Sequence, residues 1–232
     1  MLRTSVSIIL AVALLGGCSL SIQTGEGRPN AVPPPPPPAA KPGKKPRVAK
    51  PHVAKPTPPP KVPRRRPVIP STATRVTDPI AFGNGKEGAF LGLAYVIPES
   101  TERVPAPGPV PFAAVFTDKF EIKPQEFTTG FPGALLQNDW FMIRYQGEFN
   151  VPKAGKWQFR VISDDGAVLY VDDKRIVDND GVHTAKTADG AATLTEGSHW
   201  LRLDYFQASK GQVALSVLMG QNDKFTSLVG TP

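Results

Sequence analysis

The sequence is poor in residues that cross-link or bind metals strongly. It has one cysteine, Cys18, which excludes an intrachain disulfide. Of its three histidines, His183 and His199 lie in the C-terminal part, and both lack metal-ligand spacing and a cysteine partner, which argues against a zinc site. The apolar run Ile8–Leu15 is too short to span a bilayer.

The N-terminus has the features of an export signal. One positive charge at Arg3 precedes the apolar run, and small residues follow it. The sequence from Leu15 to Cys18 resembles the lipobox of bacterial lipoproteins, which implies cleavage before Cys18 and acylation of its sulfur and new amino group. Ser19 resembles the choice that sorts such proteins to the outer membrane. We predict a signal peptide at 1–17 and a lipidated Cys18; a plain signal peptide with an unused thiol is the alternative.

Charge divides the chain into two parts. Residues 1–76 contain 13 Lys or Arg and one acidic residue, Glu26, which gives +12. Residues 77–232 contain 14 basic and 19 acidic residues, which gives −5. The basic residues of the first part alternate with proline rather than with aromatic residues, and the chain carries an export signal. We therefore expect no nucleic-acid partner.

Proline dominates the segment before the second part. Residues 29–70 contain 17 prolines, including a run from Pro33 to Pro38 and repeated Lys-Pro pairs. Such a segment buries too little apolar surface to fold and favours an extended chain, in which roughly 40 residues reach on the order of 120 Å. We predict that residues 18–76 are the lipidated cysteine and a disordered Pro/Lys-rich linker. It is either a plain spacer or a cationic segment that contacts peptidoglycan or lipopolysaccharide.

Residues 77–232 are enough for one domain with its own core. Alternating apolar residues predict strands at 141–145, 147–151, 156–162, 167–171, 175–177, 191–195, 199–206 and 212–219. Further strands are expected at 90–95, 113–116 and 120–122. Short strands separated by Gly, Asp and Pro predict an all-β fold, a single β-sandwich or barrel-like domain.

The turn Ser163–Gly166 contains two neighbouring aspartates, Asp164 and Asp165. Two carboxylates at the tip of a strand pair are unfavourable unless a cation or a network of donors lies against them. Calcium, which takes about six to eight oxygen ligands, fits that need. An ordinary hairpin turn is the alternative, because Asp and Gly are common turn residues.

Four stretches, 140–147, 151–159, 163–172 and 196–206, carry a specific resemblance. In this order they resemble the protective-antigen-type (PA-14) domain, a β-sandwich found in bacterial toxins, glycosidases, fungal flocculins and adhesins. The resemblance covers roughly residues 83–220 and is strongest from 138 to 219. It implies a PA-14-like β-sandwich at 77–232.

The resemblance also implies a site. In sugar-binding members of that family, two successive Asp residues joined by a cis peptide bond hold a calcium ion, which binds vicinal hydroxyls of a sugar. Asp164 and Asp165 match that pair, and Gln207 is the side-chain ligand implied in the loop before the last strand. Lys210, in the same loop, departs from the pattern, because a cation there would weaken calcium binding or pair with an aspartate. The acidic pair also occurs in members without a known sugar site.

Other polar residues give weaker signals. Asp178–Gly181 resembles a fragment of a calcium loop without its downstream Glu, so a turn between strands is expected; a position beside the sugar site is left open. Ser198 and His199 are adjacent and should point to opposite faces of a strand, which argues against nucleophilic catalysis. A glycosidase needs two carboxyls several ångströms apart that flank the bond, and no second acidic pair stands out. We predict that the protein is not an enzyme.

The sequence therefore predicts an outer-membrane lipoprotein, facing the periplasm or the cell surface, that carries a PA-14-like carbohydrate-binding domain. The carbohydrate or glycan would bind through calcium at Asp164, Asp165 and Gln207, with Lys210 beside it. The alternative is a structural or protein-interaction module of a cell-envelope assembly without sugar binding.

Overall fold

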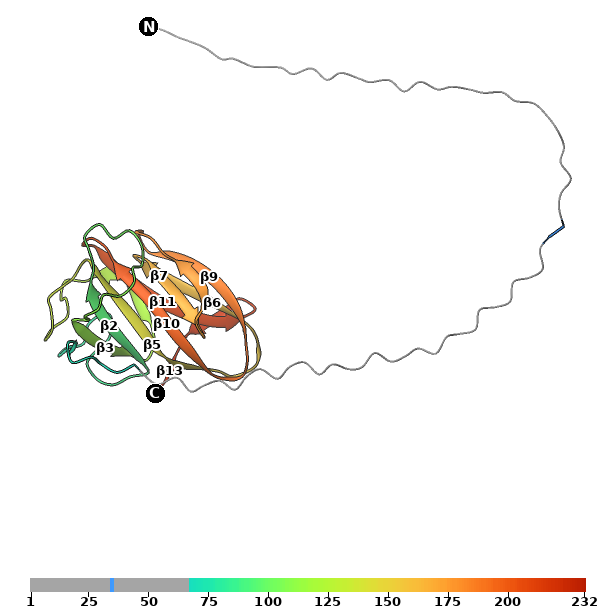
Figure 1. Cartoon of the computed structure of the whole chain (residues 1–232), viewed down its shortest axis with the longest axis horizontal. Helices are drawn as coiled ribbons and strands as arrows, with labels where there is room; N and C mark the ends of the chain where they lie inside the picture. The colour runs from blue at the N-terminus through green and yellow to red at the C-terminus, as the bar shows by residue number, and fades with distance from the viewer. Residues whose placement is uncertain (1–33, 36–66) are drawn as a thin grey trace, which may run out of the picture. The chain divides into compact units, whose positions relative to one another are not determined.

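The computed structural model describes residues 34–35 and 67–232. The predicted signal peptide, Cys18 and most of the predicted linker lie outside these residues. Within 67–232 every regular element is a β-strand, and no helix there has the length and apolarity that a membrane span requires. The all-β prediction is confirmed, and the strands form two layers (Figure 1).

The strands belong to two sheets. The first sheet has the order β1-β3-β2-β5-β10-β7-β8, with β13 beside β5. Its strands are β1 Thr74–Arg75, β2 Phe90–Val96, β3 Ala113–Thr117, β5 Phe141–Val151, β7 Ala167–Val171, β8 Lys174–Asn179, β10 Gly197–Gln207 and β13 Gly230–Thr231. The second sheet has the order β12-β11-β6-β9, with β4 beside β11. Its strands are β4 Glu121–Glu126, β6 Gly155–Asp164, β9 Lys186–Leu194, β11 Gln212–Gln221 and β12 Lys224–Ser227.

The main core lies between the two sheets because alternate residues of each strand point inward. In β5, Phe141, Ile143 and Tyr145 are fully buried, as are Phe159 and Val161 in β6. Burying one such side chain stabilises a fold by about 1.5–3 kcal/mol. The hydrophobic alternation that predicted the strands is therefore also what holds the sheets together.

Residues 67–76, which the sequence analysis placed in the linker, lie against the first sheet. β1 pairs in parallel with β3, and Val76 is buried in the main core. Ile69 packs on the outer face of the sheet, in a small cluster with Leu91 and Phe116. Folded structure therefore begins before residue 77.

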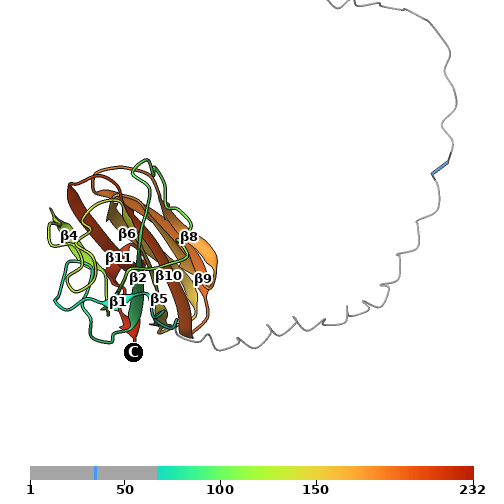
Figure 2. The ribbon, with the colours of Figure 1, turned by 60° about the vertical axis from the view of Figure 1, so that its left-hand side comes forward.

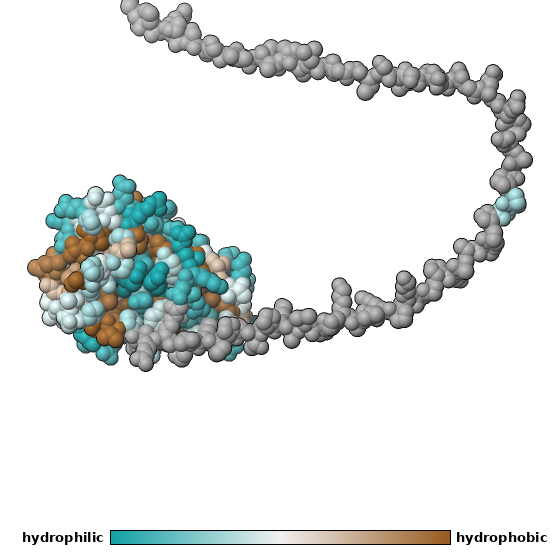
Figure 3. Space-filling model, viewed as in Figure 1, coloured by the Kyte–Doolittle hydropathy of each residue, from teal (hydrophilic) through white to brown (hydrophobic). Residues whose placement is uncertain are grey.

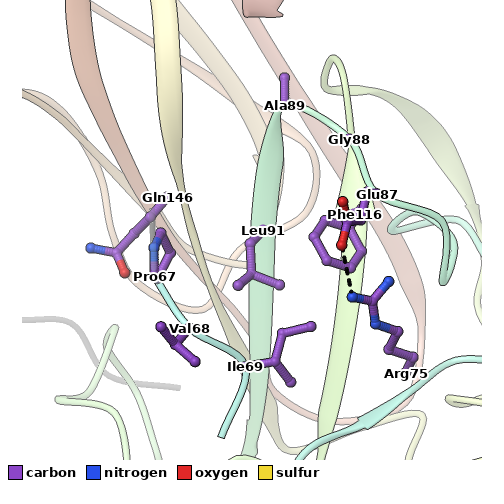
Figure 4. A pocket seen from close by; sticks show the side chains of 10 residues that line it. All are labelled: Pro67, Val68, Ile69, Arg75, Glu87, Gly88, Ala89, Leu91, Phe116 and Gln146. Atoms are coloured by element: carbon purple, nitrogen blue, oxygen red, sulfur yellow. Dashed lines mark hydrogen bonds and ion pairs between the residues drawn. The ribbon is translucent and has the colours of Figure 1, made fainter. Parts of the chain in front are cut away.

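A pocket of about 430 Å³ lies at this junction. Figure 4 shows the side chains that line it: Ile69 lies beside Leu91, while Arg75 and Glu87 lie near the Phe116 ring. Arg75 Nη2 forms an ion pair of 3.0 Å with Glu87, and its guanidinium lies 4.9 Å from the centroid of the Phe116 ring. These contacts join β1 and the loop before β2 to the outer face of the sheet.

The register of the strands brings one set of loops together. Gln207 and Val96 both pair with Phe141, and Ala167 pairs with Asn179, so these positions lie along one end of the first sheet. We call this end of the sandwich the loop end. It is formed by the connections 97–112, 127–140, 165–166, 180–185 and 208–211.

Candidate functional site

The two aspartates lie at the loop end, where the chain passes from one sheet to the other. Asp164 is the last residue of β6 in the second sheet, and β7 of the first sheet begins at Ala167. The peptide bond between Asp164 and Asp165 is cis. Both residues are buried, with 8% and 6% of their surface exposed. The fold thus encloses two adjacent carboxyl groups.

Main-chain donors from two loops hold the carboxylate of Asp165. The N–H of His183 donates to Oδ1 at 3.0 Å, and the N–H of Ala208 donates to Oδ2 at 2.8 Å. Asp165 therefore connects the loop after β8 with the loop after β10. Each of its oxygens keeps a further lone pair for another partner.

The carboxyl of Asp164 is less well compensated. Burial raises its pKa, and the negative charge of Asp165 raises it further; a hydrogen bond from the backbone of Ala185 and the proximity of His183 offset this only in part. Within residues 67–232, no Lys or Arg side chain forms an ion pair with Asp164 or Asp165. The two carboxylates therefore lie together without an ion pair to a lysine or arginine of residues 67–232.

Gln207, at the end of β10, lies beside the aspartates and is 98% buried, with 2% of its surface exposed. The hydroxyl of Tyr205 lies 2.5 Å from both Gln207 Oε1 and the backbone oxygen of Asp164. Gln207 Nε2 donates to the carbonyl oxygens of Ser209 and Gln212 at 3.3 and 3.4 Å. Its amide oxygen is thus already hydrogen-bonded, and its amide nitrogen fixes the loop 208–211.

Lys210 does not occupy the gap between the aspartates. Its side chain is exposed, and it forms no ion pair among the described residues with either carboxylate. It lies two residues beyond Ala208, whose N–H binds Asp165. The lysine is therefore on the loop that touches the site but remains at its surface.

The loop after β8 contributes backbone donors that leave no signal in the sequence. His183 and Ala185 serve through their backbone N–H groups, which any residue except proline provides. Asn179 is buried beside them, and its Nδ2 donates to Ser163 Oγ at 2.8 Å and to Lys186 O at 3.0 Å. The Asp178–Gly181 motif marked this loop, and the structure places it against the aspartates.

The donor set of the site fits a hard cation. It offers two buried carboxylates and an amide oxygen, the kind of ligands that calcium prefers. The Oδ1 atom of Asn179, buried in the same region, has no hydrogen-bond partner among residues 67–232. No cluster of three or more His, Cys, Asp or Glu residues occurs in the described part of the chain, so further ligands would have to be neutral oxygens.

Apolar side chains are exposed along the loop end of the sandwich. Figure 3 shows apolar residues grouped on the left of the domain among polar ones. The exposed apolar residues at the loop end include Val96, Val110, Leu135, Leu136 and Val182. The loop end therefore suits a ligand that has both polar groups and an apolar surface.

Ser198 and His199 use different partners. Ser198 Oγ donates to Glu148 Oε2 at 2.6 Å. His199 is buried, with Nδ1 2.7 Å from Asp172 Oδ2 and Nε2 2.9 Å from Thr195 O. Asp172 has a positive φ of 49°, a conformation that Asp adopts in turns more readily than most residues. These contacts tie the β7–β8 turn to β10 and form no serine–histidine pair.

Comparison with known families gives one match. The family model described as "PA14 domain" matches residues 126–227, which include both aspartates and Gln207. A comparison with curated proteins finds no match.

Similar solved structures support the fold. The "PA14 sugar-binding domain from RTX adhesin" has 17% identity and a TM-score of 0.50, over 62% of this chain and 98% of that one. The "PA14 domain of MpAFP Antifreeze protein" has 16% identity and a TM-score of 0.50, over 61% and 86%. An "anti-sigma factor domain-containing protein" has 15% identity and a TM-score of 0.48, and this chain spans only 45% of its length.

Proposed function

Because residues 126–227 form a PA14 domain, we propose that the protein binds a carbohydrate through a calcium ion held by Asp164 and Asp165. The observation that carries this proposal is the buried pair of carboxylates, which form no ion pair with any Lys or Arg of residues 67–232. Their burial and mutual repulsion raise the pKa of Asp164, so a divalent cation would relieve an unfavourable interaction.

Three side chains would hold the ion. Asp164 and Asp165 would supply charge, and Gln207 Oε1 would supply a neutral oxygen, with carbonyl oxygens of the loop 208–211 completing the set. When bound, calcium offers further coordination positions to the hydroxyl oxygens of a sugar. The residues of the chain position these ligands: His183 and Ala208 orient Asp165, and Tyr205 orients Gln207.

Two observations support a carbohydrate as the ligand. A solved domain of the same fold is named a sugar-binding domain. The loop end also combines a polar centre with exposed apolar side chains, which suits sugars, because they present hydroxyls and apolar C–H faces together. Exposed Lys210 would lie beside the bound ligand as a hydrogen-bond donor. Binding without catalysis is what this open arrangement favours.

The N-terminal part would present the domain at a membrane. We propose that Cys18 carries the lipid anchor in the outer membrane and that the Pro/Lys-rich linker separates the anchor from the domain. More than one acyl chain is needed for stable attachment, and lipobox cysteines carry several. The linker charge would favour contact with peptidoglycan or lipopolysaccharide.

One observation favours the alternative, a structural module. Both oxygens of Asp165 already accept hydrogen bonds from backbone N–H groups of two loops. Such hydrogen bonds can fix the conformations of the loops after β8 and β10 without any ion. The two interpretations differ in what they require of calcium.

Thermal unfolding with and without calcium separates them. A ligand at about 100 times its Kd stabilises a fold by about 2.7 kcal/mol, so excess calcium should raise the Tm by about 5–10 °C. The increase should be absent in Asp164→Asn. Asp189→Asn is the control, because Asp189 pairs with Arg160 on the second sheet and its variant should keep the full response. A melting curve unchanged by calcium would leave the structural module as the better description.

A further inference from the structure

The connection between β2 and β3, residues 97–112, is unusually long. Two neighbouring antiparallel strands are commonly joined by about two to five residues. Loops much longer than that, without secondary structure of their own, usually carry function. We call this connection the strap.

The strap extends along the loop end instead of closing a hairpin. It begins beside β5, where Ile97 N donates to Trp140 O at 2.9 Å. It then reaches the end of β8, where Val104 N donates to Asp180 Oδ1 at 2.7 Å. From β2 to β8 the sheet order counts four steps, which corresponds to about 19 Å. Figure 2 shows the strap in green, running from the top of the domain toward β8.

Apolar packing supports the strap along this path. Val104 and Ile97 pack with Met142 and Phe206 on the outer face of the first sheet. Met142 and Phe206 are fully buried. The strap therefore has a fixed position over β5 and β10. Its tip, Glu102 and Arg103, lies at the far side, next to the end of β8.

Asp180 fixes that far side. Its Oδ1 accepts hydrogen bonds from Val104 and from Gly181, and its Oδ2 lies 3.6 Å from Arg103 Nη1. Its side chain is 14% exposed, whereas that of Arg103 is 79% exposed. One partly buried carboxylate thus binds the strap backbone, while the arginine stays exposed to solvent.

The same loop touches the aspartate pair. A Cβ atom placed on Gly166 would lie 2.8 Å from Gly181 N, so the backbones of these residues are packed together. Two residues further, His183 N donates to Asp165 Oδ1. The strap tip, Asp180 and the aspartates therefore form one continuous series of contacts.

We propose that the strap is a second contact surface for the carbohydrate and that Asp180 is the residue that positions it. The site then binds an oligosaccharide more tightly than a single sugar. This inference rests on the proposed function. The loop 180–183 stands between Asp165 and the strap, so a sugar unit at the aspartates has this loop beside it, and only a longer ligand reaches Arg103. Glu102 and Arg103 are exposed charged groups that can hydrogen-bond sugar hydroxyls.

Calorimetric titration of the full chain in calcium tests this. The probes are fucose, galactose, glucose and mannose, each as the free sugar and as an oligosaccharide that ends in it. For the sugar that binds, the oligosaccharide should bind about tenfold more tightly than the monosaccharide. The double variant Glu102→Ala/Arg103→Ala should remove that advantage while the Kd values for the monosaccharide and for calcium stay within about twofold.

Asp180 variants separate positioning from folding. Asp180→Ala removes the acceptor for Val104 and should also remove the oligosaccharide advantage, whereas Asp180→Asn keeps a side-chain oxygen and should retain most of it. Equal Kd values for the two forms of the sugar, or equal losses for both in the double variant, would overturn the inference and leave the proposed function intact. Failure of every carbohydrate to bind in calcium would overturn both.

Discussion

Asp164 carries a charge that the described part of the molecule does not neutralise. Its neighbour Asp165 has two main-chain donors, while Asp164 has one hydrogen bond and a raised pKa. Residues that serve binding often lower the stability of the fold without its ligand, because the two requirements conflict at the same side chain. The stability of Asp164 variants is therefore informative in both the presence and the absence of metal.

Asp164→Asn should stabilise the metal-free domain at neutral pH by about 1 kcal/mol, because it removes a buried charge next to another. A carboxyl whose pKa is raised by folding contributes stability below the ordinary Asp range and loses it as the pH rises through the raised pKa. The difference between the variant and the wild type should therefore vanish in acid. Denaturant unfolding in chelator, measured across pH, checks this.

Asp189 provides the opposite control. A hydrogen bond from Arg160 lowers its pKa, so Asp189→Asn should cost a little stability at neutral pH and nothing in acid. The cost should stay within about 1 kcal/mol because the pair is exposed. An Asp164→Asn variant that is less stable than the wild type in chelator at neutral pH would show that the charge is satisfied within the protein.

The sequence predicts the two aspartates of the site but not the backbone groups that contact them. Two adjacent aspartates in a turn stand out because their repulsion needs a partner. The main-chain donors of His183, Ala185 and Ala208 leave no such signal, since nearly every residue has an N–H group. Tyr205 and Gln207 lie two residues apart on one face of β10. That Gln207 Oε1 accepts a hydrogen bond from the Tyr205 hydroxyl could be seen only in the fold.

The elements were predicted where apolar residues alternate strictly. β5, β6, β7, β10 and β11 all contain predicted strands. The predicted pair 141–145 and 147–151 is one strand, because Gly147 lies where β2 pairs with β5 and leaves room for the backbone of Ala89. The short strands β1, β12 and β13 were not predicted, since two to four residues show no periodicity.

β9 shows why a glycine can mislead. The apolar pattern predicts a strand only from residue 191, after Gly190, whereas β9 begins at Lys186. A Cβ atom on Gly190 would lie 1.9 Å from the backbone oxygen of Ile176 in β8. Gly190 therefore marks a close approach between the two sheets and not a break.

Gly190→Ala should lower the free energy of unfolding by about 1–3 kcal/mol, because backbone atoms must move to admit the methyl group. Gly211→Ala is the matched control. A Cβ atom there meets nothing within 4 Å, so its effect should stay within about 0.5 kcal/mol. Denaturation midpoints of both variants check the prediction, and equal midpoints would mean that β9 and β8 can separate at little cost.

The whole molecule joins two parts of opposite charge. The N-terminal residues 1–76 carry +12 and residues 77–232 carry −5. The charges of the first part are of the sign that anionic envelope polymers attract. We propose that this division serves presentation: a basic tether belongs to the envelope, and an acidic domain binds its ligand beyond it.

Cys18→Ser tests the anchor. The wild-type protein, expressed in a Gram-negative host, should incorporate radiolabelled palmitate and fractionate with the outer membrane. The variant should lose both properties because it has no other cysteine to acylate. Asp164→Asn should keep both, which separates anchoring from ligand binding. Label in the Cys18→Ser protein would contradict the proposed lipidation.

Calcium-dependent sugar binding is tested most directly by binding of the full-length protein to a glycan array in calcium and in chelator. The wild type should bind a defined set of glycans in calcium, lose them in chelator and regain them when calcium is restored. Asp164→Asn should bind none of them in either condition. Glycan binding that persists in chelator, or the absence of any binding in calcium, would contradict the claim that Asp164 and Asp165 hold an ion that holds a sugar.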